Sequence, residues 1–238
     1  MPRLPPLTLA LSSLLAASPV LAQEAGKDAK TLDTLIVTGT RVTDRTVAES
    51  QSPIDIITPE TLQATGTTEL ATALARALPS LNFPRPAMAD GTSGVRPAQL
   101  RGLSPDQVLV LVNGKRRHVS ALVNVNGTIG RGSSAVDLNA IPVAAIERVE
   151  VLRDGASAQY GSDAIAGVVN IVLKGAGKGG SLSLGGGEYS EGDGRQWQVS
   201  GDAGVTLSGG AGELHVAAQA GHQDPTNRSG TYQGTAPN

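Results

Sequence analysis

Cysteine is absent from the 238-residue sequence. Its absence excludes disulfide bonds, thiolate zinc sites and cysteine nucleophiles. An excess of basic charge is also missing, because the formal net charge is -2 and nucleic-acid binding requires a clustered basic face. Aromatic residues make up only 2% of the sequence while glycine occurs 30 times, which favours turns, bulges and β-structure over a helical bundle. We therefore expect a β-rich protein that binds no nucleic acid.

Patterns typical of enzymes are missing as well. No G-x-S-x-G nucleophile motif occurs, and no pair of carboxylates suggests hydrolysis. His118, His215 and His222 lack the spacing of metal ligands with acidic partners. A G-x-G-x-x-G pattern covers residues 175–180, but strand-like residues follow it, whereas a dinucleotide phosphate site needs a helix N-terminus. We therefore expect neither an enzyme nor a metal or cofactor site.

The N-terminus has the features of a secretory signal peptide. Arg3 supplies positive charge, residues 7–17 form a short apolar stretch, and Ala22 ends a small-residue cleavage site before polar residues. The alternative is a buried or anchoring helix, which Pro19 disfavours. No later stretch is apolar for long enough to form a transmembrane helix, so contact with a membrane would require a β-barrel or a surface.

The centre of the chain, residues 53–174, is expected to form one α+β unit. Strands are predicted at residues 54–57, 107–112, 146–152 and 166–173. Asn113 and Gly114 tolerate positive φ, so they predict a hairpin turn after the second of these strands.

Two helices are predicted between the first two strands of this unit. Thr58 can cap the first helix, with Pro59 at its first position, where a missing N–H has no cost. The second helix is expected after Thr67, with Glu69 on its first turn. Leu70, Leu74 and Leu78 recur every four residues and form its buried stripe.

Beyond Lys174 the sequence alternates between apolar and polar residues. Trp197, Val199, Ala203, Val205 and Leu207 fall on one face of a predicted strand, and polar residues fall on the other. A short turn at residues 208–212 precedes a second alternating stretch. Such segments of roughly ten residues are typical of a transmembrane barrel, although the same pattern also fits a half-buried soluble sandwich.

Several motifs together identify a family resemblance. The most informative are IERVEVLRDG at residues 146–155, YGS at 160–162 and AGVVNIV at 166–172. Upstream lie SPIDII at 52–57, LATAL at 70–74, LRG at 100–102 and VLVLVNG at 108–114. In this order they closely resemble the plug domain of TonB-dependent outer-membrane receptors, over residues 30–222. Many relatives have Arg-Gly-Pro where this chain has RDG at 153–155, but Asp-Gly also makes a tight turn.

The resemblance implies a contact segment for TonB, an inner-membrane-anchored partner that transmits energy from the proton-motive force. This TonB box corresponds to residues 34–39: Thr34, Leu35, Ile36, Val37, Thr38 and Gly39. Its β-branched residues would add a strand to the TonB C-terminal domain through backbone hydrogen bonds. Taken alone, a few apolar residues near a terminus are more often an ordinary edge strand.

The resemblance also implies two further sets of functional residues. Charges beside the plug strands would hold the plug against the barrel wall, with solvated surface charges as the alternative. These charges are Arg101, Arg148, Glu150 and Arg153, and Gly102, next to Arg101, belongs to the same structural set. The loop that runs from Asn82 to Arg96 and the loop that runs from His118 to Arg131 would face outward and contact a small extracellular ligand.

The resulting prediction is an α+β fold, in which a plug with a small mixed sheet and short helices precedes the first antiparallel strands of an incomplete transmembrane β-barrel. Residues 1–22 form the signal peptide, 23–52 a flexible segment, 53–174 the plug, and 175–238 about three barrel strands. The implied function is the N-terminal part of an outer-membrane receptor for energy-coupled uptake of a siderophore-like compound, a cobalamin or a saccharide. A truncated or split receptor is expected, because so few strands cannot close a barrel.

Three alternatives remain open from the sequence. One is a standalone periplasmic module that binds TonB or ligand without transport, another is a non-functional fragment, and the third is a secreted β-rich adhesion module.

Overall fold

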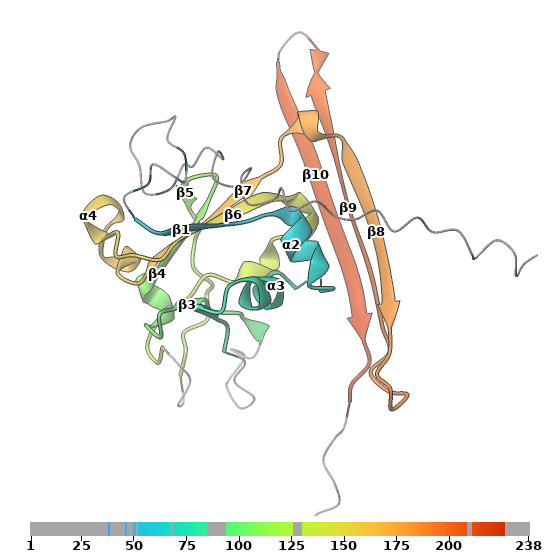
Figure 1. Cartoon of the computed structure of the whole chain (residues 1–238), viewed down its shortest axis with the longest axis horizontal. Helices are drawn as coiled ribbons and strands as arrows, with labels where there is room; N and C mark the ends of the chain where they lie inside the picture. Colours follow the sequence, from blue (N-terminus) through green and yellow to red (C-terminus); the bar gives the residue numbers. More distant parts are fainter. Residues whose placement is uncertain are drawn as a thin grey trace, which may run out of the picture.

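A five-stranded mixed sheet and a three-stranded antiparallel sheet organise the computed structural model of the chain (Figure 1). The structure describes residues 38, 46, 50, 52–67, 69–84, 94–125, 130–208 and 211–226. The expected signal peptide, at residues 1–22, lies outside them.

The five-stranded sheet has the order β1-β6-β7-β4-β5. Its strands are β1 (Ile54–Ile57), β4 (Val108–Val112), β5 (Lys115–Arg116), β6 (Ile146–Leu152) and β7 (Gly167–Leu173). The pairing of β4 with β7 is parallel, and the other pairings are antiparallel. Strands β4 and β7 lie inside the sheet and carry almost unbroken apolar runs, as expected for strands that are buried on both faces.

The turn between β4 and β5 forms at Asn113 and Gly114, as the sequence predicts. Both residues have positive φ, 49° and 74° respectively. The Asn113 side chain also accepts a hydrogen bond from the Leu173 amide at 2.8 Å. The turn is therefore tied to the end of β7 as well as to its own hairpin.

Helices cover one face of this sheet. Helix α2 (Pro59–Ala64) begins with Pro59, and the Thr58 side chain accepts a hydrogen bond from the Thr61 amide. Helix α3 (Leu70–Ala77) buries Leu70 and Leu74 completely. Among the described residues, no helix is long and apolar enough to cross a membrane.

The opposite face of the sheet packs against α4 (Ser157–Tyr160) and a short 3-10 helix, η6 (Ser162–Ala164). The remaining elements of this α+β unit are β2 (Leu81–Asn82), β3 (Gln99–Leu100), η3 (Pro105–Gln107), η4 (Leu138–Ala140) and η5 (Val143–Ala145). A further 3-10 helix, η7 (Ala176–Lys178), lies between this unit and the second sheet along the chain.

The second sheet contains β8 (Gly180–Gly187), β9 (Gln196–Leu207) and β10 (Gly212–Gln223) in the order β10-β9-β8. It stands beside the α+β unit like a section of wall (Figure 1), and we call it the wall sheet. One face exposes large apolar side chains to the outside: Leu182, Leu184, Trp197, Val199, Val205, Leu207, Leu214 and Val216. The alternation that the sequence predicts is confirmed, because cross-strand partners share a face in this register.

Candidate functional site

A fully buried carboxylate, that of Glu150, lies within β6. Its Oε1 accepts a hydrogen bond from Arg148 Nε at 2.9 Å. Its Oε2 accepts one from the Thr38 hydroxyl at 2.6 Å and a longer one from Asn170 Nδ2 at 3.5 Å. A buried carboxylate is tolerated only when donors surround it, and here both oxygens are occupied.

The sheet itself brings three of these side chains together. Arg148 and Glu150 are two residues apart on one strand, so their side chains point to the same face. Asn170 lies directly opposite Glu150 in the pairing of β7 with β6. The side-chain Oδ1 of Asn170 accepts a hydrogen bond from the Gly114 amide at 3.0 Å, so the cluster extends to the turn between β4 and β5.

The fourth member, Thr38, comes from a distant part of the chain, 112 residues before Glu150. Thr38 is fully buried. It belongs to the segment that the resemblance assigns to TonB contact, whose other members, Thr34, Leu35, Ile36, Val37 and Gly39, lie outside the described residues. The structure therefore shows one residue of the segment docked on the five-stranded sheet.

The other predicted structural residues lie at strand ends. Arg153 forms an ion pair with Asp55 of β1, with Nε and Oδ2 2.5 Å apart. Arg101 and Gly102 form a turn after β3, with φ of 59° and 74°. Arg148 and Arg153 thus find carboxylate partners within the α+β unit, whereas a role toward the barrel wall stays a prediction.

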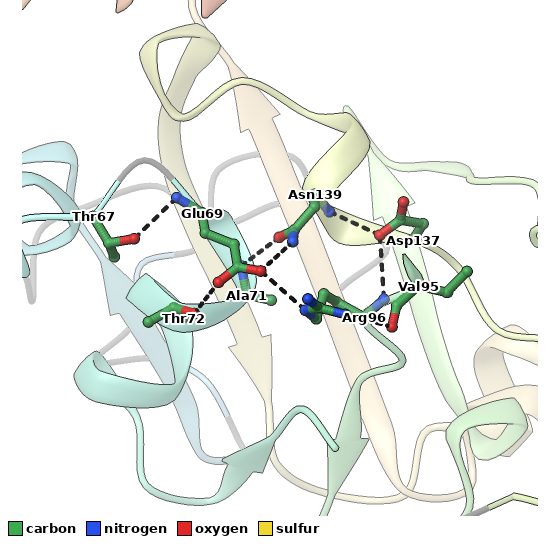
Figure 2. Close-up of polar contacts among 8 residues, drawn as sticks. All are labelled: Thr67, Glu69, Ala71, Thr72, Val95, Arg96, Asp137 and Asn139. Atoms are coloured by element: carbon green, nitrogen blue, oxygen red, sulfur yellow. Dashed lines mark hydrogen bonds and ion pairs between the residues drawn. The ribbon is translucent and has the colours of Figure 1, made fainter. Parts of the chain in front are cut away.

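A polar cluster that the sequence did not reveal surrounds Glu69 at the start of α3 (Figure 2). The Glu69 carboxylate accepts hydrogen bonds from Arg96 Nε at 2.9 Å, from Asn139 Nδ2 at 2.7 Å and from the Thr72 hydroxyl. The side-chain Oδ1 of Asn139 accepts a hydrogen bond from the Ala71 amide. This cluster fastens the start of α3, η4 and the segment that enters β3 to one another.

Glu69 stands at the N-cap position and makes no side-chain capping bond. The sequence placed it on the first turn of the helix, where it would serve the helix dipole. No local pattern indicates the cluster, because its members are separated by as many as 70 positions.

A cavity of about 750 Å³ separates the Glu69 cluster from the wall sheet. The α+β unit lines it with Gly66, Thr67, Glu69, Thr72, Arg76, Arg96 and Asn139, and the wall side with Tyr189, Gln196, Trp197, Gln198, Gln219, Gly221, His222 and Gln223. Amides and hydroxyls contribute much of this lining, so the space between α3 and the wall sheet suits water and polar solutes.

Elsewhere the wall sheet contacts the α+β unit directly. Asp202 on β9, whose side chain is almost fully buried, pairs with Lys174 Nζ at 2.9 Å and with His215 Nε2 at 3.0 Å. The Val143 amide donates to the Gln219 side chain at 3.2 Å. These contacts fix the inner, polar face of the wall sheet against the end of β7 and η5.

The loops expected to contact ligand are described in part. Residues 85–93 of the first loop and 126–129 of the second lie outside the described residues. Arg96, at the end of the first loop, belongs to the Glu69 cluster. Val123 in the second loop forms an isolated β-bridge with Ser134.

In the part of the chain that the structure describes, no group of three or more His, Cys, Asp or Glu side chains could hold a metal ion. His215 and His222 each pair with one carboxylate, Asp202 and Asp224 respectively.

Comparison with known proteins gives consistent matches. A family model described as TonB-dependent Receptor Plug Domain matches residues 46–168. The ferric enterobactin receptor of Pseudomonas aeruginosa is 34% identical over 173 residues, which cover 71% of this chain and 22% of the receptor. The vitamin B12 transporter BtuB of Vibrio vulnificus is 33% identical over 187 residues, which cover 78% of this chain and 28% of the transporter.

Solved structures agree with these sequence matches. A mutant of the P. aeruginosa ferric enterobactin receptor in complex with enterobactin has a TM-score of 0.55 at 25% identity, over 79% of this chain and 28% of that chain. The siderophore receptor PirA from Acinetobacter baumannii has a TM-score of 0.54 at 25% identity, over 74% of this chain and 25% of that chain. This chain spans about a quarter of the length of the proteins it matches.

Proposed function

This chain belongs to the family of TonB-dependent receptors, whose plug domain it carries, and from that membership we propose that it is the N-terminal part of an outer-membrane uptake receptor. The plug is followed by the first antiparallel strands of an incomplete β-barrel. In our proposal the plug closes the pore, and TonB supplies the energy that rearranges it.

The arrangement of the wall sheet carries this proposal. Its polar face rests on the plug through Asp202 and Gln219, while its other face exposes large apolar side chains from all three strands. A strand whose side chains alternate in this way suits a barrel wall between a water-filled interior and lipid. A freestanding soluble plug would expose the same apolar face to water, which disfavours that alternative.

We propose the same division of the chain that the sequence predicts. Residues 1–22 are a cleaved signal peptide, 23–52 carry the TonB box near 34–39, 53–174 form the plug, and 175–238 begin the barrel. N-terminal sequencing of the exported protein tests the first boundary, and the expected first residue is Gln23. A mature protein that still begins with Met1 would contradict export by signal cleavage.

The proposed ligand class is that of scarce, bulky nutrients, namely siderophore-like compounds, cobalamins or saccharides. Support comes from two relatives, which are named for ferric enterobactin and vitamin B12. The loops from Asn82 to Arg96 and from His118 to Arg131 are the proposed contact regions. The family is one of receptors and transporters, and we propose no catalytic activity.

The proposed TonB contact is tested by calorimetric titration of the chain, in detergent micelles, with a TonB C-terminal domain. Val37→Pro removes a backbone N–H from the added strand. We expect the affinity to fall roughly tenfold, which corresponds to the loss of one hydrogen bond between uncharged groups. Ala48→Pro, outside residues 34–39, is the matched control and should leave the affinity unchanged. No binding by the unmodified chain, or equal binding by the Val37→Pro variant, would refute the TonB contact.

A further inference from the structure

The buried contact between Thr38 and Glu150 joins the proposed TonB box to the centre of the plug. Thr38 and Glu150 are both fully buried, and their oxygens are 2.6 Å apart. A hydroxyl that donates to an ionised carboxylate makes one of the stronger side-chain hydrogen bonds. The contact crosses 112 positions of sequence, so it is a tertiary attachment and not part of a local turn.

We propose that Glu150 is a positioning residue that sets how often Thr38 leaves the plug sheet and becomes available to TonB. The consequence for TonB binding rests on the proposed function, whereas the hydrogen bond between Thr38 and Glu150 does not. Undocking withdraws the Thr38 hydroxyl from Glu150 Oε2, and the carboxylate keeps Arg148 at Oε1. Because Arg148 remains at Oε1, loss of the Thr38 hydrogen bond does not leave the Glu150 carboxylate without a cation.

The remaining partners hold Glu150 in the orientation that receives Thr38. Asn170 uses its amide nitrogen toward Glu150 and its carbonyl oxygen toward the Gly114 amide. Rotation of the Asn170 amide would lose both bonds, so the side chain is locked in one orientation. Glu150 is therefore a preformed acceptor whose position depends on β6, β7 and the turn between β4 and β5.

Three substitutions separate the effect of the Thr38–Glu150 hydrogen bond from the effect of packing. Valine has nearly the shape of threonine but lacks the hydroxyl, so Thr38→Val keeps the packing and removes the donor. Glu150→Gln keeps the shape of the acceptor and removes its charge. Glu147→Gln removes a neighbouring carboxylate on the same strand, beside Arg148, and serves as the matched control.

The experiment is hydrogen–deuterium exchange, followed by mass spectrometry, on the chain in detergent micelles. We expect exchange in the peptide that contains Thr38 to be roughly tenfold faster in Thr38→Val and in Glu150→Gln, the effect of one charged hydrogen bond. The Thr38→Val/Glu150→Gln double variant should exchange no faster than Thr38→Val alone, because without the Thr38 hydroxyl the charge at position 150 no longer affects this contact. Thr38→Ser, which keeps the hydroxyl, and Glu147→Gln should exchange at the unmodified rate.

The link to TonB is measured separately, with the TonB C-terminal domain and the Glu150→Gln variant. A larger undocked fraction raises the apparent affinity, so we expect tighter binding than to the unmodified chain. Thr38→Val is not used for this measurement, because Thr38 belongs to the TonB box itself.

Two results would overturn the proposal. One is unchanged exchange at Thr38 in both Thr38→Val and Glu150→Gln, and the other is an equal acceleration in Glu147→Gln. If Glu150→Gln unfolds the plug, Thr38→Val decides the question, because Thr38 lies outside the strands of the sheet. Faster exchange without any TonB binding would refute the proposed function while leaving the docking contact established.

Discussion

Gly167 at the start of β7 lies against the carbonyl oxygen of Leu152 at the end of β6, with no room for a side chain between them. A Cβ on Gly167 would stand 2.6 Å from Leu100 Cδ2 and closer still to the Leu152 oxygen. Gly167 also has a φ of 143°, which L side chains rarely adopt. The packing of β3, β6 and β7 thus requires glycine at this position.

Gly167→Ala is accordingly expected to destabilise the plug. Backbone strain and overpacking together should lower the free energy of unfolding by roughly 2–5 kcal/mol, measured by urea denaturation of the chain in micelles. Gly132→Ala is the control: Gly132 has a φ of 87° but nothing within 4 Å of the added Cβ, so only about 1 kcal/mol should be lost. Equal losses in the two variants would show that close packing at Gly167 is unimportant.

The Glu69 cluster predicts a second effect on stability. Asn139→Ala removes a donor to Glu69 and the acceptor of the Ala71 amide, so we expect the free energy of unfolding to fall by about 2 kcal/mol. The denaturation midpoint should fall, with an unchanged slope. Gln63→Ala, at an exposed position on α2, should leave the free energy of unfolding within about 0.5 kcal/mol of the unmodified value. A comparable loss of stability in this control would show that the Glu69 cluster does not stabilise the plug.

The attachment of the plug to the wall sheet can be followed by proteolysis. Lys174 is held by Asp202, whose side chain is only 2% exposed. Asp202→Asn weakens this ion pair, and we expect trypsin to cut after Lys174 roughly tenfold faster, the equivalent of about 1.4 kcal/mol. The control is Glu188→Gln, which removes a wide, exposed pair with Arg195 at 3.9 Å and should leave cleavage after Lys174 unchanged. Cleavage at the unmodified rate in Asp202→Asn would show that this pair does not restrain the junction.

The apolar face of the wall sheet predicts a preference for lipid. Val216, near the middle of β10, is 58% exposed on this face. An arginine at the centre of a lipid-facing strand costs roughly 2–4 kcal/mol, so Val216→Arg should reduce flotation of the chain with phosphatidylcholine vesicles. Ser183→Arg places the same charge on the opposite face of the sheet and should float like the unmodified chain. Equal flotation of both variants would argue against a lipid-facing surface.

Local sequence patterns were sufficient for most of the elements. Thr58 and Pro59 mark the start of α2, and Asn113 and Gly114 mark the turn after β4. These features depend on conformational preferences of neighbouring residues, which the sequence carries directly. The alternation beyond Lys174 likewise determined the faces of β9 and β10, because side chains alternate along any strand.

The site was decided by tertiary structure. The sequence marked Glu150 as a functional charge, but its burial and its bond to Thr38 depend on two segments 112 positions apart. The position of Asn170 beside Glu150 follows from the register of β6 and β7, and the union of Glu69 with Asn139 follows from the docking of η4 on α3. Strand and turn preferences act over a few residues, whereas the partners of a buried charge are chosen by how the whole chain packs. The sequence by itself therefore determined the elements and the family resemblance, and only the fold determined which side chain receives the Thr38 hydroxyl.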